Sequence, residues 1–88
     1  MKIDIQAVLM AGVQAHQSGD RQTAALCYQQ ILGAAPGHAD ANHLLGLVLF
    51  QAENPAHAET LIRKAISIDA NVPLYHANLG RVLKSVDY

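Results

Sequence analysis

Three glycines at one fixed spacing constrain this chain more than any other feature of its sequence. Gly12, Gly46 and Gly80 lie 34 residues apart, each within an apolar pattern of helical period. A glycine in a helix interior costs about 0.5–1 kcal/mol relative to alanine, so we expect close contact between helices to offset this cost. A phosphate-binding loop needs its glycines within a few residues of one another, so this spacing excludes it.

The residues around the glycines repeat with the same period. The middle segment, residues 42–70, reads as a complete helix-turn-helix unit built on Leu45-Gly46, Leu49, Ala58, Ile62 and Ala65. Shifted back by one period, this skeleton falls on Ala11-Gly12, Ala15, Ala24, Tyr28 and Ile31; shifted forward, it falls on Leu79-Gly80 and Leu83. A period of this length is typical of stacked helical repeats. The sequence therefore predicts an all-α fold.

This pattern resembles the tetratricopeptide repeat, in which W-x2-L-G-x2-Y is followed by A-x3-F and then by proline. The small residues and the period carry the resemblance, and Pro36 occupies the closing position of the first unit. Both complete units lack the opening aromatic residue, and Ala70 replaces the second closing proline. The resemblance implies a right-handed α-solenoid of antiparallel helix hairpins, with about 2.5 units in one domain, 1–88. The expected units are 4–37, 38–71 and a half repeat, 72–88.

Capping residues predict where the helices begin. Asp4, Asp20 and Asn54 are expected to cap three of them, and Pro55 and Pro73 suit the first helical position. The expected helices span residues 4–17, 21–33, 39–51 and 55–68, with a fifth from residue 73 onward.

The composition excludes several classes of function. A net charge of −1 provides no basic surface for nucleic acid or an anionic membrane. No apolar run approaches the length needed to span a membrane. The single cysteine, Cys27, cannot form a disulfide within the chain, so we expect a reducing, cytoplasmic environment.

No arrangement of residues indicates catalysis. The five histidines include no i, i+4 pair on one helical face and no cysteine pair accompanies them, so we expect neither a metal nor a cofactor. Cys27 is interpreted as a small packing residue rather than a nucleophile. No paired carboxylates and no Ser-His-Asp arrangement can be placed. We therefore predict that this chain is not an enzyme and acts through a surface.

In tetratricopeptide arrays the first helix of each repeat lines a concave groove that holds a peptide. The resemblance assigns eight groove residues here: Leu9, Val13, His16, His43, Leu47, Phe50, Asn78 and Arg81. Beside them it places Gln6, Asp40, Leu74 and Ala77. The apolar members could instead form the core of a short stack, and this alternative stays open.

The groove positions differ from those of family members whose ligands are known. Members that bind a terminal carboxylate use lysine, arginine and asparagine, whereas the matching positions here are Leu9, Val13, Leu44, Leu74 and Asn78. Such binding is therefore not expected. Asn78-Leu79-Gly80 resembles the repeats attached to O-GlcNAc transferases, although Met10 and Leu44 replace the other asparagines of their ladder. By that resemblance, such repeats often precede a bacterial glycosyltransferase.

The leading interpretation is a protein-interaction module whose partner the sequence does not identify. One alternative is an accessory or targeting segment of a larger enzyme such as a glycosyltransferase, which the stop after half a repeat favours. Another is a self-assembling scaffold.

An apolar stripe on the last predicted helix suggests self-association. The stripe comprises Tyr75, Leu79, Val82, Leu83 and Val86. Terminal units of helical arrays usually carry a polar outer face, so this stripe is expected to face water in a monomer. We therefore predict a homo-oligomer formed through the C-terminal helix.

Overall fold

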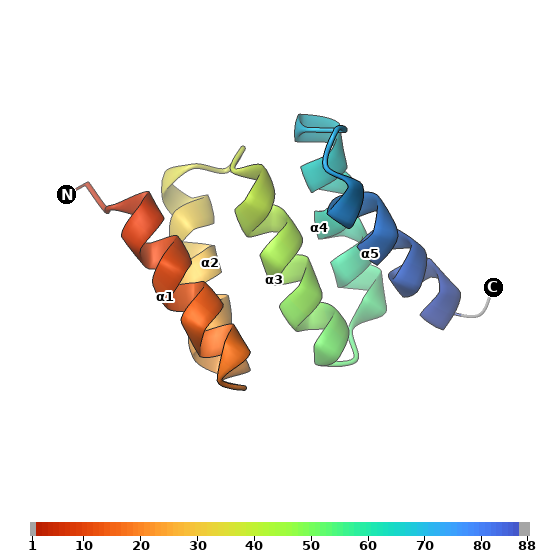
Figure 1. Cartoon of the computed structure of the whole chain (residues 1–88), viewed down its shortest axis with the longest axis horizontal. Helices are drawn as coiled ribbons and strands as arrows, with labels where there is room; N and C mark the ends of the chain where they lie inside the picture. Colours follow the sequence, from red (N-terminus) through yellow and green to blue (C-terminus); the bar gives the residue numbers. More distant parts are fainter. Residues whose placement is uncertain (1, 87–88) are drawn as a thin grey trace.

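Five α-helices make up the fold. The computed structural model describes residues 2–86, with α1 (Ile5–Gln17), α2 (Arg21–Ala34), α3 (Ala39–Gln51), α4 (Pro55–Ile68) and α5 (Pro73–Ser85) and no strand in that range. Consecutive helices form antiparallel hairpins, with α1, α3 and α5 in the front layer of Figure 1 and α2 and α4 behind them. The predicted all-α fold of five helices is confirmed. Residues 87 and 88 of the expected half repeat lie outside the described residues.

Side-chain caps and prolines fix the helix starts where the sequence predicted them. Asp4, Asp20 and Asn54 each accept a hydrogen bond from the backbone N–H three residues further on, at 3.1, 3.1 and 3.4 Å. Each cap satisfies a backbone donor that the helix itself leaves unpaired. Pro55 and Pro73 begin α4 and α5, where no intrahelical N–H bond is needed.

Two of the three glycines lie where paired helices approach closely. A Cβ atom added at Gly12 would lie 2.7 Å from the ring of Tyr28. At Gly46 it would lie 2.9 Å from Ile62 and 3.2 Å from a backbone oxygen of α4. The predicted close approach is confirmed at these positions. It is wrong at Gly80, where an added Cβ meets nothing within 4 Å because no described helix packs on that face of α5.

Buried residues of the repeated skeleton form the core. One cluster joins α2 to α3 and contains Ala24, Tyr28, Leu45 and Val48. A second joins α4 to α5 and contains Ala58, Ile62 and Val82. Leu49 of α3 packs against both clusters, so the two clusters form one continuous apolar interior. Burial of each large side chain contributes about 1.5–3 kcal/mol relative to exposure.

The expectation that the whole stripe on α5 faces water is wrong. Tyr75 and Val82 are 2% and 0% exposed. They lie 34 residues after Ala41 and Val48, which are buried on α3, so both helices use the same face to pack within the array. Only the remaining members of the stripe, Leu79, Leu83 and Val86, are partly exposed.

Candidate interaction surface

Hydrogen bonds between the first helices of successive hairpins hold α1, α3 and α5 at one offset. Each joins residues 35 positions apart, one repeat plus one residue: His16 to Gln51, Asp40 to Tyr75 and His43 to Asn78. We call the surface that these three helices form together the first-helix face. Because the offset is constant, residues at equivalent positions of α1, α3 and α5 lie in matching places along this face.

A buried polar chain links α3 to α5. Asn78 Oδ1 accepts a hydrogen bond from Arg81 Nη1 at 3.0 Å, and because a guanidinium only donates, the Asn78 amide nitrogen is directed at His43 Nε2, 2.9 Å away. Nε2 of His43 is then the acceptor, which leaves the proton of the neutral ring on Nδ1. Burial lowers the pKa of His43, and the nearby Asp40 carboxylate opposes this shift only in part.

Tyr75 forms a second link between the same helices. Its hydroxyl donates a hydrogen bond to the carboxylate of Asp40, and its ring lies against that of His43 with centroids 4.6 Å apart. Burial, followed by the hydrogen bond and negative charge of Asp40, raises the pKa of Tyr75. Both links keep buried polar groups paired, as the low dielectric of an interior requires.

His43 and Asn78 are therefore not available to a peptide, and their predicted place in the groove is corrected. They are 2% and 4% exposed because they bond to each other between adjacent helices. The residues in the same positions one repeat earlier are Leu9 and Leu44, which pack against the apolar core. At these two positions, therefore, the α1–α3 junction is apolar, whereas the α3–α5 junction is hydrogen-bonded.

The other predicted groove residues remain accessible. Those that are partly exposed are Leu9, Val13, His16, Leu47 and Phe50, while Arg81 is exposed. Leu9 and Phe50 also pack against the core clusters, so the alternative in which the apolar members belong to the core of the stack stays open. Met10 and Leu74 add to the surface and are 56% and 58% exposed.

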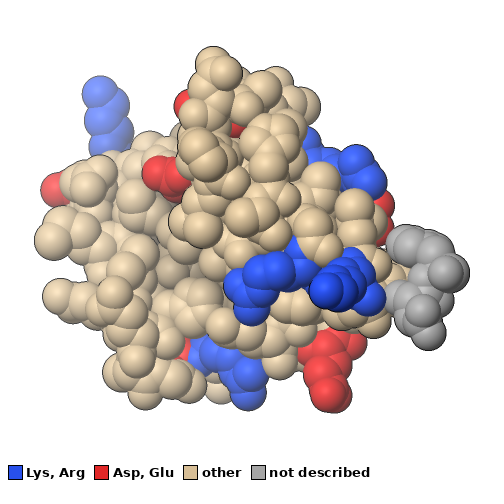
Figure 2. All heavy atoms as spheres, turned by 45° about the vertical axis from the view of Figure 1, so that its right-hand side comes forward, with Lys and Arg blue, Asp and Glu red and all other residues tan. Residues whose placement is uncertain are grey.

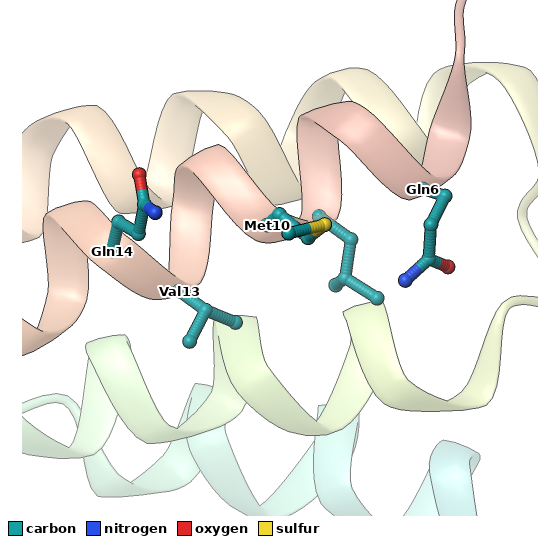
Figure 3. A pocket seen from close by; sticks show the side chains of 5 residues that line it. Gln6, Met10, Val13 and Gln14 are labelled. Carbon is teal, nitrogen blue, oxygen red and sulfur yellow. The ribbon is translucent and has the colours of Figure 1, made fainter.

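A hollow of about 260 Å³ lies on the α1 part of this surface. It is lined by Gln6, Leu9, Met10, Val13 and Gln14, which recur at helical spacing along α1 (Figure 3). Met10 and Gln14 were not predicted. Met10 occupies the same position as Leu44 and Asn78 in the later repeats, so the 34-residue register could have identified it.

Arg81 lies at the α5 end of the surface beside an aromatic ring. Its guanidinium carbon is 5.9 Å from the centroid of Phe50, within the range of a cation–π interaction. With the bond to Asn78, this contact holds the arginine from two sides.

Two further histidines and the cysteine have structural contacts. His38 Nδ1 caps α3 by accepting from the Ala41 backbone N–H at 3.1 Å, and His76 donates to the Ala70 carbonyl at 2.8 Å. Cys27 is half-buried on α2, where its Cβ faces the glycine of α1. Within residues 2–86, no three His, Cys, Asp or Glu side chains are grouped so that they could hold a metal ion. Over the same range, no helix has the length and apolar character needed to cross a bilayer.

The stacked hairpins, the glycine contacts and the 34-residue register define the class of this protein, a helical repeat array. A family profile described as tetratricopeptide repeat matches residues 15–82. The chain belongs to the tetratricopeptide repeat family.

A solved structure of similar fold gives a more particular comparison. It is a mutant of the O-GlcNAc transferase of Thermobaculum terrenum, which superposes with a TM-score of 0.89 at 36% sequence identity over 94% of this chain. The match covers only 17% of that transferase, so the similarity concerns one segment of a much longer protein. A search of curated protein sequences finds no match.

Proposed function

We propose that this chain binds a peptide or protein segment along its first-helix face. Membership of the tetratricopeptide repeat family supports the broader role of a protein-interaction module. The hollow on α1 is the observation that carries the finer proposal. Three apolar side chains and two glutamine amides line it, all from α1.

The chemistry of the surface indicates what the ligand offers. Leu9, Met10 and Val13 suit an apolar side chain, and the glutamine amides beside them can bond to a peptide backbone. Leu47 and Phe50 extend the apolar track across α3. Contact with these apolar side chains should contribute an affinity that depends only weakly on salt.

Matched substitutions on opposite sides of the array test this proposal. The probe is the tightest decapeptide recovered from a random phage-displayed library selected on the wild-type chain. We expect Leu47→Ser and Phe50→Ala each to weaken its binding at least 5-fold in calorimetric titration with helical content retained. Leu26→Ser removes a 61%-exposed leucine from α2 and should leave binding unchanged. Normal binding by both groove variants would refute the assignment.

A second candidate function is an accessory or targeting role within a larger enzyme, such as a glycosyltransferase. The similarity to a segment of an O-GlcNAc transferase favours it. In that arrangement catalysis belongs to another part of the protein, and this array selects what reaches it. Sequencing the native gene on both sides of the codons for residues 1–88 tests the idea. A transferase domain encoded in the same frame on either side would support it, whereas its absence from both sides would rule it out.

Self-assembly through α5 is a third proposal, supported by the open face at Gly80. Leu79, Leu83 and Val86 flank a surface where an added Cβ meets no neighbour. Burying about 400 Å² of it would contribute roughly 10 kcal/mol before the cost of association is subtracted. Sedimentation equilibrium should then show a dimer that Leu83→Glu abolishes. A strictly monomeric wild type at hundreds of micromolar would exclude it.

We further infer a cytoplasmic location, because one half-buried cysteine without a partner needs no oxidising compartment.

A further inference from the structure

We propose that Arg81 is an anion-binding anchor of the first-helix face, and that the bound peptide carries an Asp or Glu side chain next to an apolar one. This inference rests on the proposed peptide-binding function and specifies the chemistry of the ligand.

Arg81 is held in place before any ligand arrives. Its guanidinium lies over the Phe50 ring at 5.9 Å and donates one hydrogen bond to Asn78 Oδ1 at 3.0 Å. Asn78 is itself 4% exposed and bonded to the buried His43, so the group that orients the arginine is fixed by the packing of α3 against α5. An arginine oriented in this way loses less conformational freedom when it binds an anion.

The bonding capacity of Arg81 is largely unused. A guanidinium has five N–H donors, and the described contacts of Arg81 occupy one of them. Within residues 2–86 the ion pair is Arg63 with Glu59, and no acidic side chain of that range lies within 4 Å of the Arg81 nitrogens. Arg81 is also exposed. The remaining donors match the two oxygens of a carboxylate, which arginine binds in a bidentate manner.

The surroundings of Arg81 define the second part of the ligand. Leu47 and Phe50 are partly exposed on α3, and Leu74 is 58% exposed at the other end of α5. Figure 2 turns the α5 side forward and shows Lys and Arg side chains gathered there, with Asp and Glu side chains beside them. The unused donors of Arg81 suit a carboxylate at this end, and an apolar side chain beside it would contact α3.

Lys84 provides a matched control on the same helix. It is exposed and carries the same charge one turn after Arg81, yet no described contact holds it on an aromatic ring or a buried amide. A general attraction of acidic peptides to α5 would depend on both residues, whereas an anchor depends on Arg81 alone.

The experiment selects a random phage-displayed decapeptide library on the wild type, Arg81→Gln, Arg81→Lys and Lys84→Gln, each checked for a native melting curve. We expect peptides from the wild type and Lys84→Gln to be enriched in Asp or Glu next to an apolar residue. Those from Arg81→Gln should keep the apolar preference and lose the acidic one, with Arg81→Lys intermediate. Apolar enrichment without acidic enrichment on the wild type would overturn the anchor and leave the proposed function standing. Recovery of no specific peptide would overturn both.

A pair of peptides then isolates the carboxylate. The best acidic peptide and its twin with Gln for Glu, or Asn for Asp, are titrated calorimetrically into each variant. The wild type should bind the acidic member about 10-fold more tightly, and Arg81→Gln should reduce this ratio to about 1. A ratio that Arg81→Gln leaves unchanged, or that Lys84→Gln reduces equally, would refute the assignment.

Discussion

The same substitution at two equivalent glycines should change stability in opposite directions. Replacing Gly80 with alanine adds a methyl group where nothing lies within 4 Å. It also removes the cost of about 0.5–1 kcal/mol that glycine imposes within a helix, so the variant should be more stable by about that amount. For a domain of this size, this corresponds to a rise in melting temperature of about 2–8 °C.

At Gly46 the same gain in helix propensity is outweighed by overpacking. The added Cβ would lie 2.9 Å from Ile62 Cγ1 and 3.2 Å from a backbone oxygen of α4, and neither is the free end of a flexible side chain. Overpacking typically costs about 1–3 kcal/mol, which leaves a net loss of about 1 kcal/mol for alanine and more for leucine.

Thermal and urea unfolding, followed by circular dichroism at 222 nm, measure the change in stability of the Gly80→Ala and Gly46→Ala variants. Each variant must show the helicity of the wild type before unfolding, which controls for misfolding. A Gly46→Ala variant at least as stable as the wild type would refute the close-approach explanation of the repeated glycine. A destabilised Gly80→Ala variant would show that the α5 face is not open.

Two further predictions concern pH and backbone conformation. Burial lowers the pKa of His43 in the folded chain below its usual 6.5, so the unfolded chain binds more protons as the pH falls. The contribution of His43 to the free energy of unfolding should therefore be complete well above pH 6.5. It should be lost as the pH falls from 6.5 towards the folded-state pKa. His43→Gln should flatten the urea midpoint between about pH 7.5 and 5, and an unchanged slope would contradict this assignment. Glu53 adopts φ +63° at the turn position that Gly19 occupies one repeat earlier with φ +87°. Glu53→Gly should therefore raise the free energy of unfolding by up to about 1 kcal/mol, and a loss of that size would contradict the reasoning.

The helices were predictable because their signals are local. The caps at Asp4, Asp20 and Asn54 act over three residues, and the sequence shows both the capping side chain and the helical pattern that follows it. The 34-residue register extended this local information to the pairing of helices. It failed at Gly80, since a repeated glycine marks a position for close packing whether or not the partner helix is present.

Which helix covers a side chain was less predictable than which side chains are apolar. Periodicity placed Tyr75 and Val82 on one stripe of α5, but a stripe does not tell which neighbouring helix buries it. Comparison with the equivalent positions on α3 would have assigned both to the interior. The bond between His43 and Asn78 was harder to foresee, because it depends on the offset of 35 residues between adjacent first helices.

Mapping the bound peptide onto the chain tests the proposed interaction surface most directly. The tightest library decapeptide is titrated into the ¹⁵N-labelled chain, and backbone amide shifts are followed by nuclear magnetic resonance. We expect the largest changes on α1, α3 and α5, including Leu9, Val13, Leu47 and Phe50, with little change around Leu26 on α2. Changes concentrated on α2 and α4 would contradict binding at the first-helix face.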